Sequence, residues 1–207
     1  MKVTGLELLR RGAFNCHDPE EMLRIDVDAL ENASILARHF RDEFRIHCNV
    51  ELTSIMAKRW WQTMLGVMWP SIVVEIVERN NLLACEPVMH RTKIIAEAIR
   101  NRGGALALDD VTGTDIELRA IKELRPEILK VESAEFIAPL RQVTGTDIKL
   151  VVERIENEHE ARNAVLLGAD ELQGYWCDVQ TSEAVHYALT PPGLTATPVI
   201  HVERMVA

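Results

Sequence analysis

The sequence predicts an α/β fold in which a parallel sheet closes into a barrel. Short apolar runs alternate with helical segments along the 207 residues, and this alternation is typical of βαβ units with parallel strands. Seven such runs in a chain of this length favour a TIM-like (β/α) barrel over an open sheet. The length suits one barrel with a sizeable core, so we expect residues 1–207 to form a single domain.

The expected strands are the apolar runs, each of which ends in polar or acidic residues. They cover residues 3–9, 45–52, 71–78, 104–110, 127–132, 148–156 and 170–176. A further β-branched run at 197–202 follows a Thr-Pro-Pro-Gly turn. We expect this C-terminal run to supply an eighth strand.

The segments between the strands carry the apolar spacing of helices. The first covers residues 18–44, with Asp18 expected as its N-cap and Pro19 at its first helical position. Later helices are expected at 53–65, 88–104, 115–124, 134–143, 157–168 and 181–189.

Composition limits the function classes. The formal charge of −9 argues against binding long nucleic acid through a broad basic surface. No apolar run is long enough for a transmembrane helix, and the N-terminus lacks the pattern of a signal peptide, so we expect no membrane association. The four cysteines are scattered, which indicates reduced thiols and a cytoplasmic location.

Polar side chains stand at the end of almost every expected strand. The C-terminal ends of parallel strands meet at one face of a barrel, where active sites lie. Adjacent carboxylates raise each other's pKa unless a cation offsets the repulsion. Oxygen ligands without His or Cys suit Mg²⁺ or Mn²⁺. Each residue alone could be a solvated strand end, but together they predict a metal site: Glu7, Asn49, Glu75, Asp109, Asp110, Lys130, Glu153 and Gln173.

Seven segments, in the right order, resemble the motifs of the EAL domain, the cyclic di-GMP phosphodiesterase domain of bacterial signalling. GLELLRR (5–11) is similar to the naming motif, with Glu-Leu-Leu where Glu-Ala-Leu is usual. CNVELTS (48–54) resembles the Asn-containing strand, VEIVERN (74–80) the E-x-T-E segment, and ALALDDVTGTD (105–115) the D-D-F-G-T-G loop. ILKVE (128–132) resembles K-I-D, VVERIE (151–156) A-E-G-V-E, and GADELQGYWCD (168–178) the Q-G-Y segment.

The resemblance implies a two-metal phosphodiesterase that hydrolyses cyclic di-GMP to linear pGpG. By position, Glu7, Asn49, Glu75 and Asp109 would hold one Mg²⁺ or Mn²⁺. Asp110 would help to hold a second ion, with Asp109 shared between the two. Two divalent cations would then offset the repulsion within the Asp pair.

The resemblance also implies roles for residues around the metals. Lys130 would stabilise charge or orient the nucleophilic water, and Glu153 would complete the metal and water shell. Gln173 would position the water or a phosphate oxygen. Arg10 would lie near the substrate phosphate, and Glu78 would steady the loop after the Asp pair.

Three departures from the family pattern leave a second function open. Residues 111–115 replace the family's glycines with threonines, which are unfavourable at positive φ. The family's opening strand, with its Gln-Pro-Ile segment, is absent, and we expect residues 197–202 to fill that gap. The chain is also shorter than is usual between its motifs. The alternative is a catalytically degenerate domain that binds the nucleotide or docks on a protein, as a homodimer or with a regulatory partner.

Overall fold

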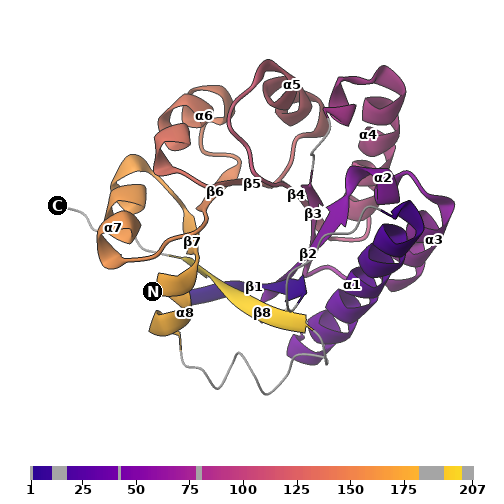
Figure 1. The fold of residues 1–207 in the computed structure, drawn as a ribbon, viewed down its shortest axis with the longest axis horizontal. Coiled ribbons are helices and arrows are strands. Elements are labelled where there is room, and N and C mark those ends of the chain that lie inside the picture. Colours follow the sequence, from indigo (N-terminus) through magenta and orange to yellow (C-terminus); the bar gives the residue numbers. More distant parts are fainter. Residues whose placement is uncertain (1, 11–17, 42, 78–80, 182–193, 202–207) are drawn as a thin grey trace.

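The computed structural model describes residues 2–10, 18–41, 43–77, 81–181 and 194–201, and for residues 10 and 194–196 it describes the backbone alone. Eight strands close into a barrel in chain order, as Figure 1 shows. They are β1 (Lys2–Arg10), β2 (Arg45–Glu51), β3 (Ile72–Val77), β4 (Ala105–Leu108), β5 (Ile128–Val131), β6 (Lys149–Val152), β7 (Glu171–Gln173) and β8 (Leu194–His201). The barrel predicted from the alternation is therefore confirmed.

The helices lie outside the ring of strands in Figure 1. They are α1 (Pro19–Phe40), α2 (Leu52–Ile55), α3 (Lys58–Val67), α4 (Glu86–Arg100), α5 (Asp115–Leu124), α6 (Ile137–Thr144), α7 (Glu158–Leu167) and α8 (Tyr175–Gln180), with 3-10 turns η1 (Leu82–Ala84) and η2 (Ala134–Phe136). Asp18 caps α1 as predicted, accepting the N–H of Glu20 at 3.0 Å. No described helix has both the length and the apolar character needed to cross a bilayer. The helix predicted at 181–189 lies, except for Thr181, outside the described residues.

Strand β8 closes the barrel, as the C-terminal run was expected to do. Strands β1 to β7 pair in parallel, whereas β8 runs antiparallel to both β1 and β7. In this register Lys2 lies opposite His201, and Gln173 lies opposite Val199. The indigo β1 and the yellow β8 lie side by side in Figure 1. Without β8, β1 and β7 would each present an unpaired edge.

Side chains that alternate inward along the strands fill the barrel in layers. At the N-terminal end, the buried Glu171 carboxylate accepts from Arg45 and, at 3.1 Å, from Lys149. An apolar layer separates this end from the opposite one, and it consists of Val73, Ala107, Ile128, Val151 and Val199. The polar residues predicted from the strand ends lie on the other side of that layer, toward the C-terminal ends of the strands. We call these residues the polar layer.

The helix predicted at 53–65 is interrupted. Ala57 has extended backbone angles, so α2 ends before it and α3 starts after it. Residues five positions apart point about 140° apart on a continuous helix. The interruption allows both Ile55 and Trp60 to be fully buried. No Gly or Pro marks this position, which is why the sequence did not indicate it.

The strand predicted at 170–176 ends early, at Gln173. Gly174 follows with a φ of 137°, and a Cβ there would lie 2.3 Å from the backbone nitrogen of Ile155. Only glycine fits this combination of backbone angle and close approach. The chain therefore turns at Gly174, and Tyr175 begins α8.

Candidate metal centre and active site

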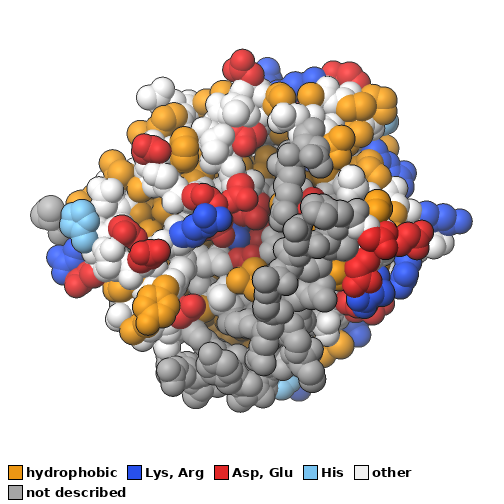
Figure 2. Space-filling view, viewed as in Figure 1, with side chains coloured by type: hydrophobic (Ala, Val, Ile, Leu, Met, Phe, Trp, Pro, Cys, Tyr) orange, Lys and Arg blue, Asp and Glu red, His pale blue; other side chains and the backbone are white. Residues whose placement is uncertain are grey.

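A cavity of about 850 Å³ opens at the C-terminal ends of the strands. Its walls come from the strand ends, from α1 and from the loops after β4 and β6. Figure 2 shows acidic side chains gathered in a hollow at the centre of this face. The volume is in the range of sites for small organic ligands.

Lys130 lies at the centre of the polar layer and is fully buried. Its Nζ lies 2.9 Å from Glu7 Oε2, 2.9 Å from Glu75 Oε2 and 2.7 Å from Glu153 Oε1. It lies 3.8 Å from Asp109 Oδ1. One ammonium group thus faces four carboxyl groups that come from four different strands or from the residue directly after them.

The protonation of this cluster follows from burial and from the excess of acidic groups. Burial raises the pKa of Asp109 to about 9, and the neighbouring carboxylates add to this rise against the opposing effect of Lys130. Burial likewise raises the pKa of Glu153. For Glu75, burial is outweighed by the charge of Lys130 and by hydrogen bonds from His47 and Lys130, so its pKa falls to about 2. Despite burial, the carboxylates hold the pKa of Lys130 well above its usual value.

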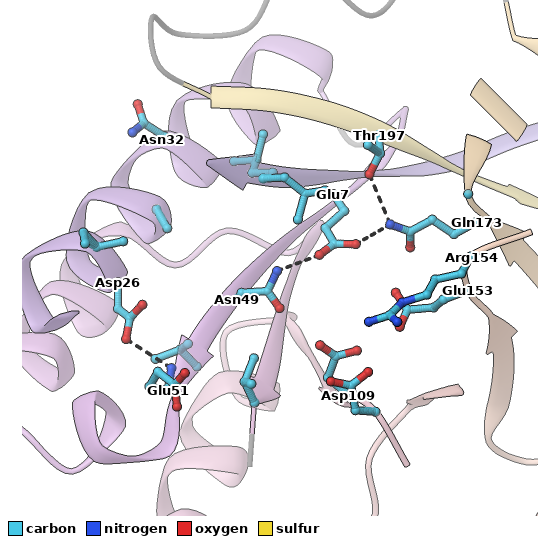
Figure 3. Close-up of a pocket in the computed structure, with 18 of the residues that line it drawn as sticks. Glu7, Asp26, Asn32, Asn49, Glu51, Asp109, Glu153, Arg154, Gln173 and Thr197 are labelled. Atoms are coloured by element: carbon cyan, nitrogen blue, oxygen red, sulfur yellow. Dashed lines mark hydrogen bonds between the residues drawn. The ribbon is translucent and has the colours of Figure 1, made fainter. Parts of the chain in front are cut away.

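Three buried side-chain oxygens in this layer accept no hydrogen bond from any described residue. They are Asn49 Oδ1, Asp109 Oδ1 and Gln173 Oε1. The amide nitrogens of the same Asn and Gln are used: Asn49 Nδ2 donates to Glu7 Oε1 at 2.6 Å, and Gln173 Nε2 donates to Glu7 Oε2. Figure 3 shows these groups converging on the cavity. Buried oxygens that lack a hydrogen bond and lie beside carboxylates fit the ligand set of a hard divalent cation.

A second group of oxygens extends from the buried layer to the exposed part of the cavity. Asp109, Asp110 and Glu153 each offer a carboxylate oxygen, and these atoms lie within 4.8 Å of one another. Asp110 has a φ of 53°, which Asp tolerates better than most residues. The Asp pair thus divides between the buried layer and the exposed mouth.

The loop of residues 111–115 avoids the strain expected from its threonines. Gly113 takes the positive φ, at 88°, whereas Thr114 has a φ of −64°. The Thr114 hydroxyl accepts the Glu117 N–H, and the Glu117 carboxylate accepts the Thr114 N–H at 2.7 Å. Through this capping box the loop forms the N-terminal cap of α5, although its sequence departs from the family pattern.

Comparisons with known proteins address the fold. No family model matches the chain. An uncharacterised protein of Synechocystis, sll1895, is 27% identical over 165 residues, which cover 69% of this chain and 23% of that relative. An EAL domain protein from Listeria monocytogenes matches with a TM-score of 0.63 at 17% identity, covering 84% of this chain and 81% of that one. The chain has the EAL fold.

A second solved structure with this fold carries ligands. The Klebsiella pneumoniae protein BlrP1, in a manganese and cyclic di-GMP complex, matches with a TM-score of 0.63 at 17% identity. The match covers 87% of this chain and 47% of that one. Identities this low establish the common fold only. The activity of this chain must be argued from its own residues.

Within this EAL fold, the structure brings together eight of the ten predicted site residues around one cavity. They are Glu7, Asn49, Glu75, Asp109, Asp110, Lys130, Glu153 and Gln173. The backbone of Arg10 ends β1 at the same face, but its side chain lies outside the described part. Glu78 also lies outside the described residues. The roles given to all ten stay predictions.

Two residues that the sequence pattern did not single out contact members of this cluster. His47 is fully buried, and its Nδ1 lies 2.6 Å from Glu75 Oε1. The Thr197 hydroxyl accepts from Gln173 Nε2 at 3.1 Å, as Figure 3 shows. Strand alternation could have indicated His47, two positions before Asn49. Thr197 had no such signal, because its position in the barrel depends on the register of β8.

Asp26 in the cavity wall is a buried carboxyl group that does not contact Lys130. Its Oδ2 accepts a hydrogen bond of 3.1 Å from the backbone N–H of Glu51. Glu51 is the N-cap residue of α2. Burial raises its pKa from 3.8 to about 6, against hydrogen bonds from Ser54 and Glu51 that lower it. A raised pKa means that stability is fully present below pH 3.8 and is progressively lost as the pH rises to about 6.

Replacing Asp26 with Asn is therefore expected to stabilise the protein by roughly 1–3 kcal/mol near pH 8, because the amide oxygen can accept the Glu51 N–H and the side chain carries no charge. The gain should be about half as large near pH 5. Urea unfolding at both pH values measures it. Asp28→Asn, half exposed on the same helix, is the control and should change stability by less than about 0.5 kcal/mol. A gain independent of pH would contradict the assignment.

Proposed function

We propose that this chain is a metal-dependent phosphodiesterase that hydrolyses cyclic di-GMP to linear pGpG. The observation that carries the proposal is the buried layer in which oxygens of Asn49, Asp109 and Gln173 accept no hydrogen bond from the described residues and lie among carboxylates. This donor set suits Mg²⁺ or Mn²⁺. The BlrP1 complex, which contains manganese and cyclic di-GMP on the same fold, supports the choice of metal and substrate.

Two groups of residues would hold the ions. Glu7, Asn49, Glu75 and Asp109 would hold the first, and Asp109, Asp110 and Glu153 would hold the second. When bound, such ions lower the pKa of a water molecule and stabilise the attacking and leaving oxygens of an in-line displacement. They would also neutralise the negative charge that one ammonium group leaves uncompensated in this layer.

The chain's own groups would act around the reacting phosphate. Lys130 holds Glu7, Glu75 and Glu153 in place through direct contacts and places a positive charge beneath the cavity floor. Gln173 keeps its Oε1 free because its amide nitrogen is bound by Glu7 and Thr197. That oxygen would accept a hydrogen bond from the nucleophilic water and so orient it.

The deciding experiment compares turnover of cyclic di-GMP by the wild type and by Glu7→Gln, with Mn²⁺ and then Mg²⁺. Glu7→Gln removes a carboxylate from the metal set with little change of volume. We expect wild-type conversion to pGpG, detected by chromatography, and a loss of at least about 100-fold in the variant. Metal affinity, measured separately by calorimetry, should fall in parallel.

The matched control is Glu171→Gln, which makes the same change at the opposite end of the barrel. Glu171 is buried, but its partners Arg45 and Lys149 reach solvent. We expect this variant to keep its turnover within about threefold of the wild type. Equal losses in both variants would mean that the effect comes from folding and would count against the assignment.

A nucleotide-binding regulator without catalysis is the second candidate. Lys130 contacts Glu7, Glu75 and Glu153 directly, so the layer is partly neutralised by the chain's own charge. Such a domain would bind cyclic di-GMP and signal through a protein partner or a second copy of itself. Binding without conversion to pGpG, with metal supplied, would favour this function over the phosphodiesterase.

A further inference from the structure

Arg154 adopts a backbone conformation that side chains rarely take, at the edge of the cavity. Five described residues other than glycine have positive φ. Arg41, Asn81 and Arg125 flank helices, where such angles are common. Asp110 and Arg154, at φ 53° and 54°, both line the cavity instead. Left-handed residues away from caps concentrate at functional sites.

The sequence around Arg154 makes this conformation informative. Residues 151–156 resemble a motif that has glycine at the position of Arg154. Glycine adopts a positive φ without a steric penalty, whereas arginine does not. The position therefore carries a strained arginine where the backbone suits glycine. This combination points to a role for the side chain.

The Arg154 side chain is placed to meet a ligand. Figure 3 shows it beside Glu153, with the guanidinium directed into the cavity. It forms an ion pair with the carboxylate of Glu132, and the two side chains are 72% and 41% exposed. Ion pairs this exposed contribute little to stability and exchange easily. A stronger anion entering the cavity could replace Glu132.

Arg154 carries one of the few positive charges in the described lining of an otherwise acidic cavity. The basic residues among its described lining are Arg24 and Arg154, and acidic residues outnumber them. Arg24 forms ion pairs with two carboxylates on α1, Glu21 and Asp28, whereas Arg154 pairs with Glu132 and is the more exposed of the two arginines. Bound cations in the floor would attract a phosphate, and a guanidinium at the rim could hold its outer oxygens.

We propose that Arg154 binds a phosphate of the nucleotide substrate, with its guanidinium leaving Glu132 for two phosphate oxygens. The inference rests on the proposed function, because it takes a nucleotide phosphodiester as the ligand. Planar bidentate contacts of this kind are particular to arginine. Arg154 would therefore set substrate affinity and would not take part in the chemical step.

The test has two parts. Cyclic di-GMP binding is measured by calorimetry with Ca²⁺ in place of Mn²⁺, and turnover is then measured with Mn²⁺. Arg154→Gly is expected to weaken binding by about 10- to 100-fold and to raise KM alike, with kcat within about threefold of the wild type. Arg154→Lys should lie between, because it keeps the charge and loses the fork. The glycine variant should be folded and no less stable, since glycine suits the backbone.

Arg125→Gly is the matched control. Arg125 has a φ of 49° at the end of α5, at the opposite end of the barrel. The substitution removes the same charge and relieves the same backbone conformation, so binding should not change. Glu132→Gln removes the partner and keeps Arg154, so binding should stay within about threefold of the wild type or tighten.

The outcomes separate this inference from the proposed function. A wild type that does not bind cyclic di-GMP overturns both. A wild type that binds, with Arg154→Gly binding equally well, overturns the role of Arg154 alone. Equal weakening in Arg154→Gly and Glu132→Gln would also overturn it, because the ion pair would then act structurally.

Discussion

Deleting residues 194–207 is expected to abolish soluble folding, because β8 pairs with both of its neighbours. The deletion would expose the edges of β1 and β7 and remove Val199 and Ile200 from the core. Burial of two such side chains contributes about 3–6 kcal/mol, comparable with the whole stability of many domains. Soluble yield and thermal melting followed by circular dichroism measure the effect.

Two further variants define the role of β8. Removing residues 202–207 alone keeps all of β8 and should leave folding intact. Moving the β8 segment to the N-terminus should also give a folded barrel, since Lys2 and His201 are already register partners and a short linker can join their ends. A deletion variant that melts like the wild type would show that the barrel does not need this strand.

Replacing Lys130 with Met is expected to destabilise the metal-free protein by about 3–5 kcal/mol, because it leaves buried carboxylates without their cation. Glu7, Glu75 and Glu153 would lose a partner within 3 Å. Mn²⁺ should recover part of this stability by supplying charge to the same layer. Chemical unfolding with a chelator and then with Mn²⁺ measures both effects.

Lys93→Met is the control for this substitution. Lys93 pairs with Glu123 at the surface, with side chains 41% and 28% exposed, so the change should be below about 1 kcal/mol and independent of metal. If Lys130→Met were as stable as the wild type in the chelator, the carboxylates would already be neutral by protonation. The central role given to Lys130 would then be wrong.

The sequence predicted most of the strands and helices because their signals are local. The apolar runs that alternate with helical segments predicted β1 to β7 to within a few residues. The bounds predicted for α5 are those observed. The capping signal at Asp18 needed only neighbouring residues. The interruption before α3 was missed because the burial of both Ile55 and Trp60 depends on distant packing.

The candidate site was predictable in part for a similar reason. Side chains at the ends of parallel strands must meet at one face of the barrel. Residue type and strand position were therefore enough to predict that one site contains Glu7, Glu75, Asp109, Lys130 and Glu153. The distances between these side chains were not predictable, because a side chain's reach across a barrel depends on strand tilt and stagger.

The sequence by itself determined the kind of barrel and the chemical character of its open end. Tertiary structure alone decided that β8 enters antiparallel between β1 and β7, because strand direction depends on the path of the chain between elements. It alone brought the Lys130 ammonium within 3 Å of three carboxylates and placed Arg154 over the cavity. Electrostatic balance in a buried layer arises from groups far apart in the chain, and only the closed fold brings their charges within reach of one another.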